Sequence, residues 1–214
     1  MVVIFDLDDT LYPEMEFVRS AYRAVSRRYG SHLLGPMLAA PTPREAFDST
    51  GLPIGEVLEL YRSHRPDIRL PWQSLYVLHG LARSGHVLGL VTDGRSLTQR
   101  HKIEALGLAR FMHLDLMIIS EEIGAEKLSG EAFRIIMERT SGNGPYVYVG
   151  DNPEKDFVAP NRLGWLTVGY RRGGNGENIS PYDADSVAEE SRPLIEIDNL
   201  CELIGLVNFG KLKE

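Results

Sequence analysis

An apolar run leads directly into three carboxylates in the segment Val2-Val3-Ile4-Phe5-Asp6-Leu7-Asp8-Asp9. The apolar and β-branched character of residues 2–5 predicts a strand that is buried on both faces, as strands of parallel sheets are. Asp6, Asp8 and Asp9 then follow at the carboxyl end of the strand, where open α/β sheets place their ligand sites. The segment therefore predicts a class of fold and the edge of the sheet that carries a site.

Short apolar runs alternate with segments of helical length along the rest of the chain, which indicates βαβ units around a parallel sheet. The predicted strands are residues 2–5, 87–91, 116–119, 146–149, 166–170 and, more weakly, 194–197. We therefore expect an α/β fold in which helices flank a parallel sheet of five or six strands.

Residues 13–71 interrupt this alternation, because they contain helical patterns but no run typical of a strand. Glycines and prolines separate these helical patterns from one another. We expect a small, all-helical subdomain at residues 13–71, inserted into a core made of residues 1–12 and 72–214. Residues 171–186 have loop composition without periodicity, so a surface loop is predicted there.

The overall composition is that of an ordinary globular protein, with 43% hydrophobic and 25% charged residues. A formal net charge of −7 provides no long-range attraction for nucleic acid, so none is expected as a partner. The single cysteine, Cys201, cannot form an internal disulfide, which favours a reducing, cytoplasmic compartment. No apolar run approaches the roughly 20 residues of a membrane span or resembles a signal peptide, so neither membrane association nor secretion is expected.

Polar residues suited to phosphate chemistry follow three further predicted strands: Thr92-Asp93-Gly94, Lys127 and Gly150-Asp151-Asn152. The carboxyl ends of parallel strands converge, so these residues would gather around Asp6 and Asp8. Two carboxylates so close in sequence repel each other unless they share a proton or a cation. A hard divalent metal ion bound by both is the simplest way to offset this repulsion. Together the groups could surround one phosphoryl group and neutralise its transition-state charge.

These segments resemble the motifs of the haloacid dehalogenase superfamily. Residues 3–12 (VIFDLDDTLY) match the first motif, residues 90–94 (LVTDG) the second, Glu126-Lys127 with Phe133 downstream the third, and residues 149–156 (VGDNPEKD) the fourth. The matches occur in the order of the family, and the resemblance extends from residue 2 to about residue 170. It implies a Rossmann-like catalytic core, phosphatase-type hydrolysis, and a helical cap after the first motif, which residues 13–71 resemble.

Carried onto this chain, the resemblance makes Asp6 the nucleophile that becomes a transient aspartyl phosphate. Asp8 would protonate the leaving oxygen and then activate the water that attacks the intermediate. Thr92 would hydrogen-bond the phosphoryl oxygens, and Lys127 would pair with both the nucleophile and the phosphoryl group.

The resemblance also implies Mg²⁺ as the cofactor. The Asp6 carboxylate, the Asp8 backbone carbonyl and Asp151 would hold the ion, with Asp156 supporting the metal shell. Asp9 and Asp93 are interpreted as turn or capping residues.

The third motif departs from many relatives, in which proline follows the lysine. Here Leu128-Ser129-Gly130 follows Lys127, so the position of Lys127 is the least defined of the four catalytic candidates. Gly130 could supply the backbone freedom that the loop needs without proline.

Asp8 favours a phosphatase over a dehalogenase, since a dehalogenase has no leaving oxygen to protonate. A phosphomutase would retain Asp8 and stays an alternative, as does a catalytically weak relative that serves as a binding protein. A receiver domain of a signalling system also combines acidic residues, Thr and Lys at strand ends. However, a receiver is shorter and has no long insert after its first strand.

The predicted activity is therefore magnesium-dependent hydrolysis of a small phosphorylated metabolite, such as a sugar phosphate or a nucleotide. The cap would select the leaving group, and the candidates for that contact are Arg19, Tyr22, Arg23, His64 and Arg65. Either a monomer or a homodimer agrees with the sequence.

Overall fold

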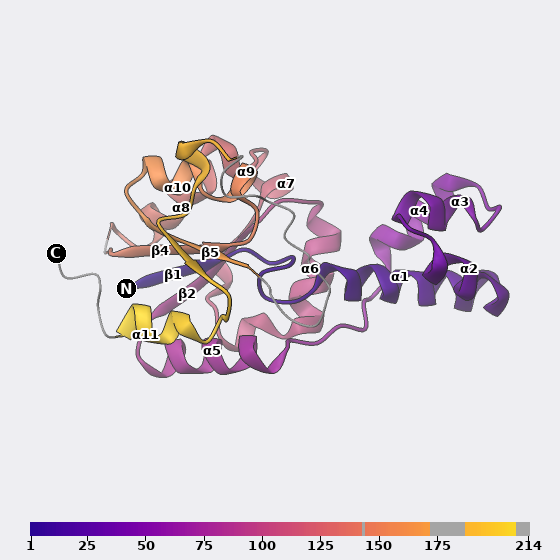
Figure 1. The fold of residues 1–214 in the computed structure, drawn as a ribbon, viewed down its shortest axis with the longest axis horizontal. Helices are drawn as coiled ribbons and strands as arrows, with labels where there is room; N and C mark the ends of the chain where they lie inside the picture. Colours follow the sequence, from indigo (N-terminus) through magenta and orange to yellow (C-terminus); the bar gives the residue numbers. More distant parts are fainter. Residues whose placement is uncertain (143, 172–186, 209–214) are drawn as a thin grey trace. The chain divides into compact units, whose positions relative to one another are not determined.

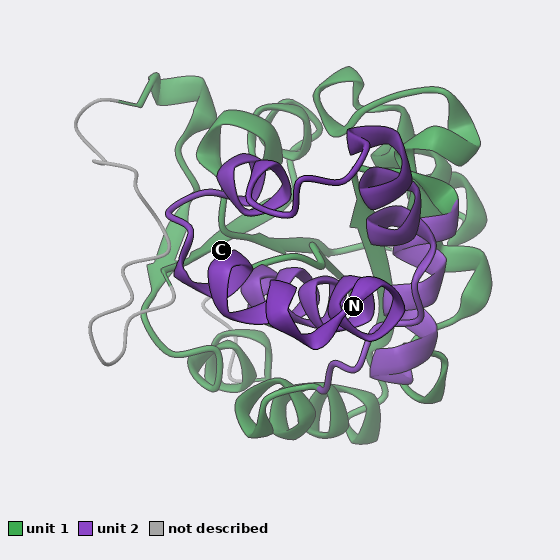
Figure 2. Cartoon of the chain, turned by 90° about the vertical axis from the view of Figure 1, so that its right-hand side faces the viewer, with its two compact units in different colours: residues 1–12, 70–96, 108–214 green, residues 13–69, 97–107 purple. Residues whose placement is uncertain are grey.

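The computed structural model describes residues 1–142, 144–171 and 187–208 of the chain. The chain forms two compact units, which Figure 2 distinguishes by colour. Unit 1 comprises Met1–Tyr12, Leu70–Ser96 and Leu108–Glu214, and unit 2 comprises Pro13–Arg69 and Leu97–Gly107. The sequence interpretation placed residues 97–107 in the core, and the identification of the units with a catalytic core and a cap remains a prediction.

A parallel sheet of six strands forms the centre of unit 1 (Figure 1). Its strands, in the spatial order β3-β2-β1-β4-β5-β6, are β1 (Val2–Phe5), β2 (Val87–Thr92), β3 (Met117–Ile119), β4 (Tyr146–Gly150), β5 (Leu166–Tyr170) and β6 (Ile195–Ile197). β1 lies between β2 and β4, with Phe5 paired in register with Leu90 on one side and Val149 on the other. The α/β fold and all the predicted strands are confirmed, with observed ends that differ by no more than one residue.

Helices cover both faces of the sheet in unit 1. The helical segments are α5 (Trp72–Arg83), η2 (Leu108–Arg110), η3 (Leu114–Leu116), α7 (Ser120–Ile123), η4 (Lys127–Ser129), α8 (Glu131–Arg139), α9 (Pro153–Asp156), α10 (Val158–Arg162), η5 (Glu189–Ser191) and α11 (Glu202–Asn208). α5 and α11 lie on one face, and α8 and α10 lie on the other (Figure 1). Because both faces are covered, every residue of β1 is at most 2% exposed, which explains why the strand has no polar residue.

All the regular elements that the structure describes in unit 2 are helical. Its segments are α1 (Glu14–Tyr29), η1 (Ser31–Leu33), α2 (Leu34–Ala39), α3 (Pro43–Asp48), α4 (Ile54–Ser63) and most of α6 (Ser96–Leu106). α1 has acidic residues in its first turn and basic residues in its last turn, which complements the helix dipole. Its apolar face packs in a separate core, where Tyr22 meets Phe47 edge to face with ring centroids 6.1 Å apart. Tyr22, a candidate for substrate contact, is therefore occupied in packing within unit 2.

The predicted surface loop at residues 171–186 lies outside the described residues apart from Arg171. Within the described part of the chain, none of the helices has both the length and the apolar character to cross a membrane.

His64 joins α4 to α6 inside unit 2. Its Nδ1 donates to the Tyr61 carbonyl at 2.8 Å, and its own carbonyl accepts from His101 Nδ1 at 3.1 Å. The side chain is buried, and no described residue offers a hydrogen bond to its Nε2. Burial lowers the pKa of His64, and the positive charges of His101, Arg27 and Lys102 act in the same direction, although the Tyr61 carbonyl opposes them. The folded protein therefore favours a neutral His64.

We predict that unit 2 loses stability as the pH falls below 6.5, the usual pKa of histidine. Above that pH His64 is neutral in both states, but below it the unfolded chain takes up a proton that the folded chain resists. His64→Asn keeps a donor near the Tyr61 carbonyl and has nothing to protonate. In thermal melts at a series of pH values, the Tm of His64→Asn should fall less toward acid pH than the Tm of wild type.

His32→Asn is the control, because His32 is an exposed histidine of the same unit. It should follow the wild-type dependence. Equal acid sensitivity of His64→Asn and wild type would contradict the assignment.

Candidate active site

The Lys127 ammonium lies between two carboxylates at the carboxyl edge of the sheet. Its Nζ contacts Asp6 Oδ1 and donates to Asp156 Oδ1 at 2.7 Å. Asp6 directly follows β1, and its backbone N–H donates to the Val149 carbonyl of β4 at 2.8 Å. All three side chains are buried, with exposed fractions of 6% for Asp6, 5% for Lys127 and 1% for Asp156. The fold thus brings together three residues from separate sequence motifs.

Asp156 uses both of its carboxylate oxygens. Besides Lys127, Oδ1 accepts from the Tyr148 hydroxyl at 3.2 Å, while Oδ2 accepts from the backbone N–H groups of Asp151 at 3.1 Å and Asn152 at 2.9 Å. These bonds close the loop after β4 around one carboxylate. Asp156 therefore fixes both Lys127 and the backbone that carries Asp151.

Gly150, at the end of β4, makes this close approach possible. A Cβ atom at Gly150 would lie 2.4 Å from Asp156 Oδ2 and 2.7 Å from its Cγ, far inside normal contact. Asp156 cannot easily move away, because four partners hold its side chain. Glycine is therefore required at this position for steric reasons.

Asp151 and Asp8 are each held by a hydroxyl of the first motif. Thr10 Oγ1 donates to Asp151 Oδ1 at 3.0 Å, and the Tyr12 hydroxyl donates to Asp8 Oδ1. The loop that carries these groups turns tightly, with Asp9 in a left-handed conformation at φ 56°. This agrees with the interpretation of Asp9 as a turn residue.

Thr92 lies on the β2 side of the site, and the backbone of Lys127 is bonded to the segment that follows β2. Thr92 is the last residue of β2, next to β1, and is 2% exposed. Asp93 accepts a hydrogen bond from the Lys127 backbone N–H at 3.1 Å and so positions the third-motif segment. That segment forms the short helix η4, and Gly130 ends it with a φ of 78°. Glycine adopts that conformation without strain, so Lys127 is positioned by a turn that Gly130 allows.

At the carboxyl edge of the sheet, three carboxyl groups surround the single ammonium of Lys127. Asp6, Asp151 and Asp156 each offer a carboxylate oxygen, and the three oxygens lie within 4.8 Å of one another. Burial raises the pKa of Asp6 well above its usual value, and Asp156 and Asp151 add to this effect, while Lys127 opposes it. Burial, Asp156 and Asp9 raise the pKa of Asp151 to about 7. Burial alone would lower the pKa of Lys127, but Asp156 and Asp6 hold it well above its usual value, so Lys127 remains a cation.

This donor set fits a hard divalent cation, because Mg²⁺ prefers carboxylate oxygens and Lys127 balances only one of three acidic groups. Since Asp156 already has partners for both oxygens, we regard Asp6 and Asp151 as the stronger candidates for direct ligation. Asp156 then acts through Lys127 and the loop after β4.

Three partners in the site were not anticipated from the sequence: Thr10, Tyr12 and Tyr148. Thr10 and Tyr12 lie inside the first motif, but a hydroxyl in a motif does not reveal its partner. Tyr148 stands two residues before Gly150, so strand periodicity places both on one face of β4 and could have indicated it.

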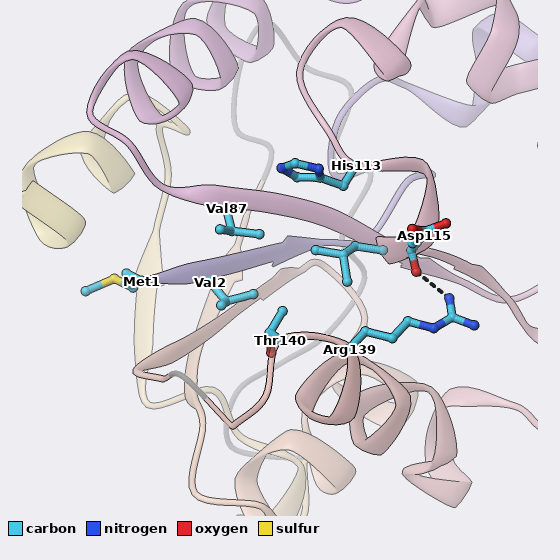
Figure 3. A pocket seen from close by; sticks show the side chains of 8 residues that line it. Met1, Val2, Val87, His113, Asp115, Arg139 and Thr140 are labelled. Carbon is cyan, nitrogen blue, oxygen red and sulfur yellow. Dashed lines mark hydrogen bonds between the residues drawn. The ribbon is translucent and has the colours of Figure 1, made fainter.

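A pocket of about 690 Å³ lies at the opposite edge of unit 1 (Figure 3). Val2 and Val87, which begin β1 and β2, form part of its wall, so the pocket opens at the amino ends of the strands. Arg139 donates to the backbone carbonyl of Asp115 beside it. None of the predicted catalytic or metal residues lines this pocket.

Comparisons with known proteins by family model, by sequence and by structure each found matches. A model of the haloacid dehalogenase-like hydrolase family matches residues 3–169. Glyceraldehyde 3-phosphate phosphatase of Methanopyrus kandleri is 32% identical, and the match covers 96% of each chain. Ribulose-1,5-bisphosphate 5-phosphatase of Halopiger xanaduensis is 27% identical over 96% of this chain and 98% of its own. Among solved structures, an HAD phosphatase from Thermococcus onnurineus has a TM-score of 0.59 at 25% identity, covering 96% of this chain and 97% of that one.

We predict that Gly150→Ala displaces the Asp156 carboxylate and impairs the site. The added methyl group should lower the free energy of unfolding by about 1–3 kcal/mol, a typical cost of overpacking. Turnover of 4-nitrophenyl phosphate should fall by about tenfold or more, because Lys127 and the Asp151 loop lose a common anchor. Urea unfolding and steady-state kinetics measure the two effects.

Gly205→Ala serves as the control, since a Cβ at Gly205 of α11 meets no atom within 4 Å. It should leave turnover unchanged and stability equal or slightly higher. Normal activity in Gly150→Ala would show that the Asp156 position is not needed.

Proposed function

The chain belongs to the haloacid dehalogenase-like hydrolase family, and we propose that this phosphatase is a magnesium-dependent phosphomonoester hydrolase that acts on small phosphorylated sugars through an aspartyl phosphate. The observation that carries the proposal is the buried Lys127 ammonium held between Asp6 and Asp156, with the Asp151 carboxylate beside them. Such a group of charges can stabilise the dianionic phosphoryl group of a substrate.

In the proposed reaction an Asp6 oxygen attacks phosphorus, while the bond from phosphorus to the leaving oxygen breaks. Asp8 donates its proton to that oxygen, so the product leaves as an alcohol. A water molecule then attacks the aspartyl phosphate, and Asp8 takes the proton of that water as the bond from phosphorus to Asp6 breaks. Asp6 is thereby restored and inorganic phosphate is released.

The remaining groups orient and neutralise charge. Lys127 is fixed by its contacts with Asp6 and Asp156 and is proposed to pair with a phosphoryl oxygen. Thr92, at the end of β2, is proposed to donate its hydroxyl to another phosphoryl oxygen. Mg²⁺, held by Asp6, Asp151 and the Asp8 backbone carbonyl, would supply further positive charge toward the phosphoryl group.

The proposed substrate class rests on two of the relatives, which are named as phosphatases of glyceraldehyde 3-phosphate and of ribulose 1,5-bisphosphate. Both match nearly the whole of this chain, so the similarity includes unit 2 as well as the site. A small sugar phosphate is therefore preferred to a nucleotide as the substrate. Residues 13–71 are proposed to act as the cap that selects it.

We predict that wild type releases phosphate from 4-nitrophenyl phosphate and from glyceraldehyde 3-phosphate or another small sugar phosphate, and that a chelator abolishes the activity. Asp6→Asn should lower kcat by about 10⁴-fold or more, because the amide cannot serve as the nucleophile. Asp48→Asn removes an exposed carboxylate of α3 and should retain full activity.

A failure to release phosphate from any member of a sugar phosphate panel would contradict hydrolysis. Transfer of the phosphoryl group within such a substrate would identify a phosphomutase instead. Binding of a sugar phosphate without any reaction would indicate a catalytically weak binding protein.

We also predict that Mg²⁺ binds more tightly as the pH rises from about 6 to about 8, because the ion must displace a proton from Asp151. The Asp151 pKa of about 7 in the metal-free protein places the change in this range. Calorimetric titrations in buffers of different ionisation enthalpy measure both the affinity and the protons released. Asp151→Asn should lose the pH dependence together with most of the affinity, and a pH-independent affinity in wild type would argue against Asp151 as a ligand.

A further inference from the structure

The hydroxyl group of Tyr12 contacts Asp8, the proposed general acid. Its side chain is 0% exposed, and its hydroxyl donates a hydrogen bond to Asp8 Oδ1. A phenol is a neutral donor, so it can hold this carboxyl oxygen whether Asp8 is ionised or carries its proton on the other oxygen. The contact therefore suits a group that changes its protonation during a reaction.

The backbone next to Tyr12 is held by two hydrogen bonds at Leu11. The Leu11 N–H donates to the Leu7 carbonyl at 3.0 Å, and the Leu11 carbonyl accepts from Ser74 Oγ at 2.6 Å. Ser74 is itself 1% exposed and belongs to α5, so the loop is tied to a helix that packs on the sheet. The phenol is consequently a fixed support, because its ring is fully buried and the preceding residue is hydrogen-bonded on both its N–H and its carbonyl.

We propose that Tyr12 is a positioning residue that orients Asp8 for proton transfer to the leaving oxygen. The hydrogen bond to Oδ1 fixes the rotation of the Asp8 carboxyl group, which orients its proton for transfer. As the Asp6 oxygen bonds to phosphorus and the bond to the leaving oxygen breaks, that proton moves from Asp8 to the leaving oxygen. The Tyr12 hydroxyl keeps its own proton throughout. This inference rests on the proposed function, in which Asp8 is the general acid.

The leaving group provides a direct test. 4-Nitrophenolate is a stabilised anion that departs without a proton, whereas the alkoxide of a sugar phosphate must be protonated as it leaves. The parameter kcat/KM reports only the steps up to the first irreversible bond cleavage, so it is insensitive to hydrolysis of the aspartyl phosphate. A misplaced Asp8 should therefore lower kcat/KM for a sugar phosphate selectively.

Tyr12→Phe is the matched variant, since phenylalanine keeps the ring and removes only the donor. We expect kcat/KM for 4-nitrophenyl phosphate to stay within about threefold of wild type. For the sugar phosphate that wild type hydrolyses best, it should fall by about 10- to 100-fold, part of the usual contribution of a general acid. Asp8→Asn should show the same selectivity with a larger loss for the sugar phosphate.

Tyr146→Phe controls for the loss of a buried phenol hydrogen bond. The Tyr146 hydroxyl bonds Thr140 Oγ1 at 2.8 Å, near the amino end of β4 and away from the proposed site. Tm values of both variants report whether they fold. Tyr146→Phe should retain the wild-type ratio of kcat/KM between the two substrates, whatever its effect on stability.

Three results would separate the hypotheses. An equal loss on both substrates in Tyr12→Phe, or no loss on either, would overturn the positioning role while Asp8→Asn remains selective. If Asp8→Asn shows no selectivity, Asp8 is not the general acid, and the inference about Tyr12 falls with it. If wild type hydrolyses neither substrate, the proposed function fails first.

Discussion

The site depends on the ion pairs that the buried Lys127 ammonium makes with Asp6 and Asp156. Removing an isolated charge from water costs several kcal/mol, so a lysine that is 5% exposed requires partners of opposite charge close by. Asp6 and Asp156 supply them, and they come from the end of β1 and from α9. The strands, the turn at η4 and the loop after β4 must therefore keep their mutual positions, since the loss of one partner would leave a buried charge uncompensated.

The parallel sheet meets this requirement through its strand order. With β1 between β2 and β4, three carboxyl ends lie next to one another, and Asp6, Thr92 and Gly150 all come from these ends. Gly150 then lets Asp156 approach the backbone closely enough to accept two N–H bonds. The charge cluster therefore depends on the edge of the sheet. Close packing at Gly150 and attraction to Lys127 both hold the Asp156 carboxylate in the same place.

At this edge of the sheet, Asp6 and Asp8 of the first motif have different surroundings. Asp6 lies in a buried group of charges with Lys127, Asp151 and Asp156, whereas Asp8 is partly exposed and bonds to the phenol of Tyr12. Asp6, the proposed nucleophile, must be ionised, which burial opposes and the Lys127 ammonium favours, whereas Asp8, the proposed general acid, must exchange a proton. The difference in surroundings, between residues separated by one leucine, follows from strand geometry at Asp6 and from the tight turn at Asp9.

The sequence alone determined the strands, the fold class and the identity of the candidate residues, because alternation of apolar runs and the motif order are local properties. It could not determine that Asp156 contacts Lys127, that Tyr148 and Tyr12 supply hydroxyls, or that residues 97–107 group with unit 2. Nor could it identify the short helix η4 that carries Lys127 and ends at Gly130 in a left-handed conformation. Lys127 and Asp6 are 121 residues apart, and such a contact depends on strand order and helix packing together. Local sequence patterns determine the helices and strands, but only the folded chain determines which side chains lie together in the buried site.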